Sequence, residues 1–247
     1  MFEEPYRWME AVSTRHNYVH EKLKMGQPVM AVPYNEGLLI FGFAPQPGKI
    51  FEVYDRIALG GVGHPADVER LRMNLLDMAH LEGFNRSAQD VTSARLLQFG
   101  IAPALKQNFE EIQRAPYIIR MLLVELDNKG KTNFFRMNYD GHWETFKNGT
   151  AIAGEEKVMD WLQKEIQKQP FATYSLEQAL QQACKLWDES RKLDSDDETK
   201  KNIPETLQEA FDQWYLEGAV LTEKSMRKAI YRPLSKSEIE KLKSSAF

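Results

Sequence analysis

The sequence predicts an α+β fold of four layers, an αββα sandwich, with an extra helix at the N-terminus. Runs of strand-like segments alternate with pairs of amphipathic helical segments along the chain, which is typical of sheets covered by helix pairs on their outer faces. The segment 117–126, YIIRMLLVEL, is almost continuously apolar and indicates a strand buried on both faces. With 247 residues the chain is long enough to bury such a core as one domain, 1–247.

The first helix is predicted over 5–24, where Trp8, Val12, His16, Val19 and Leu23 recur at helical spacing. Pro5 suits a first helical turn, and Gly26 suits the residue after a last one. A hairpin follows, with strands at 28–34 and 38–43 around an Asn-Glu-Gly loop. Pro33 cannot donate to a ladder, which places it near a sheet edge or a strand end.

The stretch 49–80, KIFEVYDRIALGGVGHPADVERLRMNLLDMAH, predicts a strand, a tight turn, a second strand at 57–62 and a long helix. Glycines at 60, 61 and 63 lie where the second strand passes into the helix. A second long helix is expected from the periodic apolar residues between Val91 and Ile112, with a start at 87–90 and an end before Pro116.

The C-terminal half repeats this alternation. Strands are expected at 117–126, 133–138, 143–146 and 150–154, helices at 155–168 and 175–191, a final hairpin at 213–222 and 227–232, and a closing helix at 235–244. The segment 192–212 is polar and acidic and predicts a loop insertion. Whether 204–212 within it forms a short helix stays open.

Composition excludes several classes of function. Arginine and lysine number 32 against 36 acidic residues, a net charge of −4, which argues against a dedicated nucleic-acid binder. No apolar run reaches the roughly 18 residues of a membrane span, and residues 1–12 do not resemble a secretory signal. Cys184 is the only cysteine and cannot form an internal disulfide, so a reducing, cytoplasmic setting is expected.

Lys49 and the start of the helix after Gly63 could form a small anion site. A helix N-terminus offers unpaired N–H groups and the positive end of a dipole, and a hairpin would place the Lys49 ammonium nearby. Such a pocket suits a single carboxylate, including a peptide C-terminus. The alternative is a solvent-exposed lysine and a glycine that only permits a tight turn.

Other candidate residues favour structural interpretations. His16 and His20 share the spacing of a zinc pair, but the sequence HNYVH lacks the glutamate that zinc proteases place after the first histidine, so no metal is expected. The glycines match neither a dinucleotide fingerprint nor a phosphate-binding loop, and no cofactor is expected. Cys184 lies at an apolar helical position typical of a buried, inert thiol.

The run from Lys49 to Phe84 resembles the corresponding segment of bacterial-type proteasome α subunits, with its Lys-Ile-x-x-x-Tyr-Asp-Arg core, its small-residue strand ending in glycine and its acidic helix start. The helix over 5–24, VMAVPYNEGLLIF, APYIIRMLLVEL, FRMNYDGHW and RKAIYRPLS also resemble the family. The resemblance covers about residues 5–190 and 213–243. It implies the N-terminal-nucleophile hydrolase fold and a ring, expected to be heptameric, that stacks on catalytic β subunits.

The resemblance implies a noncatalytic subunit. Active relatives begin with a threonine before the first strand, where this chain has Gly26-Gln27-Pro28. Their catalytic aspartate and lysine find no match here, since this chain has LLIFGFAPQ at the place of the aspartate. No catalytic residue is therefore expected. In α subunits the residues at Lys49 and Gly63 form a pocket for the C-terminal carboxylate of an AAA+ ATPase, and the N-terminal segment, here within 1–26, gates the pore. The alternatives are an active peptidase processed near Ser13-Thr14, and an orphan ring or scaffold protein.

Overall fold

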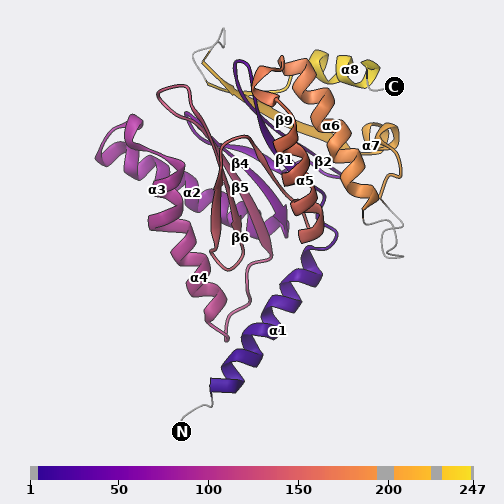
Figure 1. Cartoon of the computed structure of the whole chain (residues 1–247). Helices are drawn as coiled ribbons and strands as arrows, with labels where there is room; N and C mark the ends of the chain where they lie inside the picture. The colour runs from indigo at the N-terminus through magenta and orange to yellow at the C-terminus, as the bar shows by residue number, and fades with distance from the viewer. Residues whose placement is uncertain (1–4, 194–202, 224–229, 246–247) are drawn as a thin grey trace.

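The structure, a computed structural model, describes residues 5–193, 203–223 and 230–245. Two five-stranded antiparallel sheets lie face to face (Figure 1). Sheet A has the strand order β10-β9-β2-β1-β8, and sheet B has the order β3-β4-β5-β6-β7. The strands are β1 Val29–Tyr34, β2 Gly37–Ala44, β3 Ile50–Tyr54, β4 Ile57–Gly63, β5 Ile119–Leu126, β6 Thr132–Asn138, β7 Trp143–Phe146, β8 Thr150–Ile152, β9 Tyr215–Thr222 and β10 Tyr231–Pro233.

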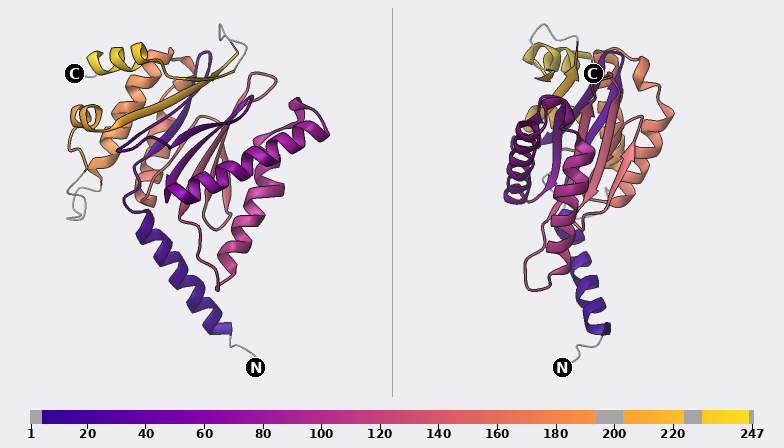
Figure 2. Two further views of the ribbon diagram at one scale, coloured as in Figure 1. Left: turned by 180° about the vertical axis from the view of Figure 1, so that it is seen from behind. Right: turned by 90° about the vertical axis from the view of Figure 1, so that its left-hand side faces the viewer.

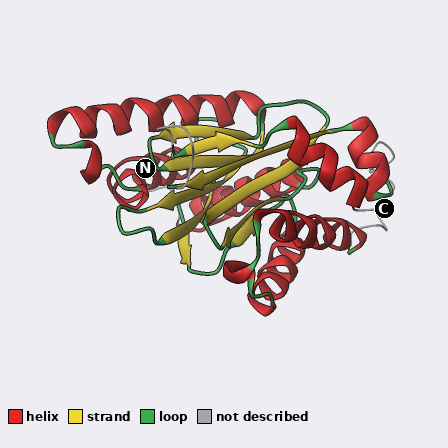
Figure 3. Cartoon of the chain, turned by 90° about the horizontal axis from the view of Figure 1, so that it is seen from above, coloured by secondary structure: helices red, strands yellow, loops and turns green. Residues whose placement is uncertain are grey.

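Helices cover the outer faces of both sheets, which confirms the predicted αββα sandwich (Figure 3). The α-helices of the described residues are α1 Pro5–Leu23, α2 Pro65–Asn85, α3 Ser93–Leu96, α4 Ala102–Glu110, α5 Glu156–Lys168, α6 Leu176–Lys192, α7 Leu207–Gln213 and α8 Lys236–Ser245. Short 3₁₀ turns lie at Ala88–Asp90 and Phe171–Thr173. Within the described ranges, no helix combines the length and apolar composition that crossing a bilayer requires.

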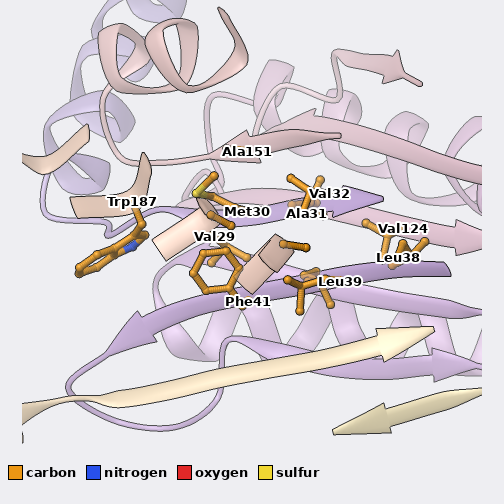
Figure 4. Packing of buried hydrophobic residues seen from close by; sticks show 14 of the residues in the cluster. Val29, Met30, Ala31, Val32, Leu38, Leu39, Phe41, Val124, Ala151 and Trp187 are labelled. Carbon is orange, nitrogen blue, oxygen red and sulfur yellow. The ribbon is translucent and has the colours of Figure 1, made fainter. Parts of the chain in front are cut away.

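The largest core cluster lies between the two sheets and continues through sheet A to α5 and α6. Strand β5 is buried along its whole length, as its apolar sequence predicts. Trp187 of α6 is fully buried, packs against Phe43 with ring centroids 4.4 Å apart, and donates from Nε1 to the Pro28 carbonyl oxygen (3.1 Å). Figure 4 shows this end of the core, where Trp187 lies beside the start of β1.

Helix α1 projects from the sandwich, and its first turns lie beyond the sheets (Figure 2). The helix is anchored through the buried residues Val19 and Leu23, through the partly buried Val12 and through Arg15. The Arg15 guanidinium donates to the carbonyl oxygens of Asn108 (3.0 Å), Ile112 (3.3 Å) and Arg114 (2.7 Å), near and just after the C-terminal end of α4. A cation there also complements the helix dipole.

The second long helix differs from its prediction. It runs from Ser93 to Glu110 and contains one π-helical turn, Leu97–Ile101. The Thr92 hydroxyl caps the start of the helix by accepting from the Arg95 N–H at 3.4 Å, so Val91 lies before the helix. Ile112 lies after its end at Glu110. Pro103 supplies no N–H inside the helix, and a π-turn just before it is a common way to accommodate such an interruption.

The C-terminal segment settles one open question. Helix α7, capped by the Thr206 hydroxyl, occupies Leu207–Gln213, so the predicted loop 192–212 is replaced by a helix in its last part. Residues 194–202 of that predicted insertion, and 227–229 of the predicted final strand, lie outside the described residues. The closing helix is α8.

Candidate carboxylate-binding corner

Gly63 ends β4, and the backbone requires a glycine at this point. Its φ is +140°, a value that L side chains rarely adopt. A Cβ atom would lie 2.0 Å from the Ile118 carbonyl oxygen, at the place where Gly63 pairs with Ile119 of β5. Any side chain here would push β4 and β5 apart just before α2 begins.

The expectation of unpaired N–H groups at the start of α2 is wrong. Pro65 has no N–H, the Ala66 N–H donates to Nδ1 of the N-cap residue His64 (3.3 Å), and the next two N–H groups donate to the His64 carbonyl oxygen. The Asp67 carboxylate also lies in the first turn, where it accepts from the Ile118 N–H (2.9 Å). The chain's own capping groups thus satisfy this helix end and place a negative charge on it.

Lys49 lies directly before β3, and its side chain reaches the segment that precedes β1. Its Nζ donates to the Gln27 carbonyl oxygen at 3.0 Å. Burial lowers the pKa of Lys49 to about 8, and the negative charge of Glu217 partly offsets that effect. Although the residue keeps some solvent exposure, its ammonium group is not that of a freely solvated lysine.

Lys49 and Gly63 lie on neighbouring chain segments at one end of sheet B. The Lys49 carbonyl oxygen accepts from the Gly61 N–H (2.8 Å), so Lys49 lies opposite Gly61. Gly63 lies two residues beyond Gly61 on β4, so these two glycines are about 7 Å apart at the usual rise of a strand. The two predicted residues therefore share a corner of the sheet, with the ammonium turned toward Gln27.

Glu217 of β9 completes this corner, and the sequence analysis missed it. Its carboxylate accepts from three consecutive backbone N–H groups, of Gly48 at Oε1 and of Lys49 (2.9 Å) and Ile50 (3.1 Å) at Oε2. The contact joins the two sheets, since β9 belongs to sheet A and β3 to sheet B. A single acidic residue inside the apolar strand LEGAVLT is the signal that could have identified it.

Arg120 of β5 is a second missed residue in the same region. Its guanidinium is fully buried and donates from one nitrogen to the carbonyl oxygens of Ala153 and Gly154, both at 2.8 Å. The Gly154 N–H in turn donates to the Gly26 carbonyl oxygen (2.8 Å). Arg120 thus ties β5 through the β8–α5 junction to the connection between α1 and β1.

The residues directly before β1 are Gly26, Gln27 and Pro28, where the resemblance places the nucleophile of active relatives. That no lysine matches the catalytic one stays a prediction; the Lys49 ammonium lies beside Gln27. Lys49, 22 residues further along the chain, reaches this point from the segment directly before β3. Thr14 lies on the exposed surface of α1 instead.

A cavity of about 40 Å³ opens beside Gly26, Gln27 and Pro28. Ligand pockets in proteins measure about 300 Å³ or more, so this one holds far less than a peptide side chain and its backbone. It is lined on its other sides by α5 and by the end of α6.

The histidines and the cysteine have separate, structural surroundings. His16 Nδ1 lies 3.0 Å from the Tyr139 hydroxyl, whereas His20 Nε2 lies 3.9 Å from a carboxylate oxygen of Glu155. In the part of the chain that the structure describes, no three His, Cys, Asp or Glu side chains gather as a metal site would need. Cys184 is buried, and burial raises the pKa of its thiol.

Comparison with known proteins places these residues in a family. A family model described as proteasome subunit matches residues 43–203, which include Lys49 and Gly63. Proteins named proteasome subunit alpha are similar to the chain: 28% identical over 148 residues in Nocardioides sp., covering 59% of this chain and 57% of the relative, and 30% identical over 148 residues in Streptosporangium roseum, covering 58% and 56%.

A third relative of the same name, from Parafrankia sp., is 29% identical over 169 residues and covers 66% of this chain and 69% of the relative. The chain thus spans a little over half the length of the first two relatives. The family model covers well over half of the chain, and the two facing sheets with their outer helices agree with it. The chain belongs to the proteasome subunit family.

Proposed function

We propose that this chain is a noncatalytic α-type subunit of a bacterial-type proteasome core particle. As one proteasome-subunit domain over 1–247, it forms an outer ring, heptameric with its neighbours, that stacks on β-type catalytic subunits in the cytoplasm. The ring controls substrate entry, with the gate in the segment 1–26, and docks an AAA+ ATPase. It needs no cofactor and binds neither nucleic acid nor membrane.

One observation carries the noncatalytic role. The positions directly before β1 hold Gly26, Gln27 and Pro28, none of which offers a hydroxyl or thiol nucleophile. The chain also continues upstream of them into α1, which is anchored to the body by Val19 and Leu23. The similarity to proteins named proteasome subunit alpha supports the same assignment.

We assign ATPase docking to Lys49 and Gly63. An ammonium has three N–H donors, and the described contacts of Lys49 Nζ include one acceptor, the Gln27 carbonyl oxygen. A partly buried cation whose described hydrogen bond is to a neutral carbonyl gains from an incoming carboxylate, because charge-assisted hydrogen bonds are the stronger kind. The partner's C-terminal carboxylate supplies that charge.

The test is Lys49→Ala in particles reconstituted with the β-type chain of the same genome. A synthetic peptide with the C-terminal residues of the genome's ring ATPase should stimulate peptide hydrolysis by the wild type but not by the variant. Ring assembly, followed by native mass spectrometry, should be unchanged in both. Lys168→Ala is the matched control, since Lys168 is exposed on α5 and its ion pair among the described residues is with Glu165, three residues earlier. Equal stimulation of Lys49→Ala and wild type would refute the docking assignment.

An active N-terminal-nucleophile peptidase is the alternative, and intact mass distinguishes it. The proposal predicts that the purified chain carries no species beginning at Thr14, alone or with β subunits. A processed chain with its own hydrolytic activity would favour the alternative. Co-purification with a threonine-bearing β chain separates the proposal from an orphan ring or scaffold protein.

A further inference from the structure

The Glu217 carboxylate accepts three backbone hydrogen bonds at the Lys49 corner. The donors are the N–H groups of Gly48, Lys49 and Ile50, which lie 167–169 residues away in sequence. Successive N–H groups that converge in this way form a nest, a concave backbone arrangement that binds anions. Here the anion is a side chain of the facing sheet.

The nest depends on Gly48 and on a short, sharply turned connection. Gly48 has a φ of +118°, a conformation that favours glycine, and it follows Pro45 and Pro47 in the connection from β2 to β3. Strand β3 is an edge strand of sheet B, paired on one side with β4. Without Glu217 the chain directly before β3 would keep the Lys49 carbonyl bond to Gly61 but lose all three contacts that fix its N–H groups.

The charge of Glu217 also acts on the Lys49 ammonium. Burial lowers the pKa of Lys49, and Glu217 is the charged group that raises it again. Tyr231 of β10 lies near both Glu217 and Glu52 of β3. Burial, with these two carboxylates, raises the pKa of Tyr231 to about 12, so the phenol is neutral. On the far side of Gln27, Lys24 and Glu155 line the small cavity.

We infer that Glu217 is the positioning residue of the docking corner: its carboxylate holds the Gly48–Ile50 backbone so that the Lys49 ammonium is presented to a carboxylate of a protein partner. This inference deepens the proposed function and rests on it. Glu217 itself does not bind the partner's carboxylate, since both groups carry negative charge and the oxygens of Glu217 face the three backbone N–H groups. It acts through the place and the protonation of Lys49.

Two measurements on the assembled particle test the inference. The first follows acetylation of Lys49 by acetic anhydride with mass spectrometry between about pH 6 and about pH 10, because only the neutral amine reacts. In the wild type the reactive fraction should rise through about pH 8. Glu217→Gln keeps the shape of the side chain but removes its charge, so the pH midpoint of Lys49 acetylation should move to lower pH. Glu144→Gln, another strand glutamate paired with Arg136, should leave it unchanged.

The second measurement is the affinity of the same ATPase peptide, fluorescently labelled. Glu217→Ala should bind about tenfold or more weakly than wild type, since losing roughly 1.4 kcal/mol of interaction changes affinity tenfold. Glu217→Asp keeps a carboxylate on a shorter side chain. Its peptide affinity should lie between those of Glu217→Ala and wild type, and its Lys49 acetylation midpoint between those of Glu217→Gln and wild type. Native mass spectrometry confirms that each variant assembles.

The outcomes distinguish a failure of the positioning role of Glu217 from a failure of the docking role of Lys49. An unchanged Lys49 midpoint in Glu217→Gln, or wild-type peptide affinity in Glu217→Ala, would overturn the positioning role. If instead Lys49→Ala binds the peptide as well as wild type, the docking assignment fails, whatever the acetylation midpoint shows.

Discussion

Gly63→Ala should destabilise the protein far more than an ordinary glycine substitution. The new Cβ atom would lie 2.0 Å from the Ile118 carbonyl oxygen and 2.9 Å from the Ile119 Cα atom, so the backbone of β4 or β5 must move. Overpacking of this kind costs about 1–3 kcal/mol, and a φ of +140° adds about 1–3 kcal/mol for a residue other than glycine. The free energy of unfolding should fall by about 2–6 kcal/mol.

Gly130→Ala is the matched control. Gly130 also has a positive φ, +73°, in the turn between β5 and β6, but a Cβ atom there meets no other atom within 4 Å. Its substitution should therefore cost only the conformational penalty of about 1–2 kcal/mol.

Thermal unfolding measured at equal protein concentrations compares the two variants. A chain of this size loses about 2–4 °C in melting temperature per kcal/mol, so Gly63→Ala should melt about 8–16 °C below wild type for a mid-range cost of about 4 kcal/mol. Gly130→Ala should lose only about 3–6 °C for a mid-range cost of about 1.5 kcal/mol. Equal losses in the two variants would refute the steric argument for Gly63.

Three further predictions concern the core and the C-terminal helix. Trp187→Phe keeps much of the packing against Phe43 but leaves the Pro28 carbonyl without its donor, so denaturant unfolding should show a loss of about 1–3 kcal/mol; a neutral substitution would contradict the contact. Cys184 should resist iodoacetamide in the native state and react once the chain is unfolded in urea, because burial raises the pKa of its thiol; rapid native labelling would show that the site is open. Burial raises the pKa of Glu238, but hydrogen bonds from Arg232 and Ser235 outweigh this and lower it to about 2. The stability that Glu238 contributes is present above its unfolded pKa and is lost as pH falls through about 2, so Glu238→Gln should flatten the acid unfolding profile below about pH 4.5; an unchanged profile would contradict the assignment.

The sequence predicts the layers and most element boundaries because they depend on local periodicity. The apolar run before Asp127 and the glycine-containing loop after Tyr34 each indicate their element within a few residues. The second long helix shows the limit of this reasoning. Its periodic apolar residues extend to Val91, which is buried outside the helix, and to Ile112, which is exposed beyond the helix end. The π-turn before Pro103 leaves no periodic signature.

The candidate corner is less accessible to sequence reasoning, because its contacts join distant segments. The chemistry of a lysine near a helix start points to Lys49 and Gly63, and the resemblance points to the same pair. The acceptor of the Lys49 ammonium, Gln27, and its electrostatic partner, Glu217, lie 22 and 168 residues away. The anion site at the α2 N-terminus was predicted from a general property of helix ends. His64 cancels that property locally, and the sequence His64-Pro65 is a capping signal that could have been weighed against it.

In the proposed function, the Lys49 corner binds the terminal carboxylate of the ATPase. The affinities of the free-acid and amidated forms of the ATPase peptide for the assembled wild-type ring measure this interaction. The amidated peptide retains every side chain and lacks only the charge that Lys49 should bind, so it should bind about tenfold or more weakly below pH 8, where Lys49 is largely protonated. Equal affinity of the two peptides would contradict the account.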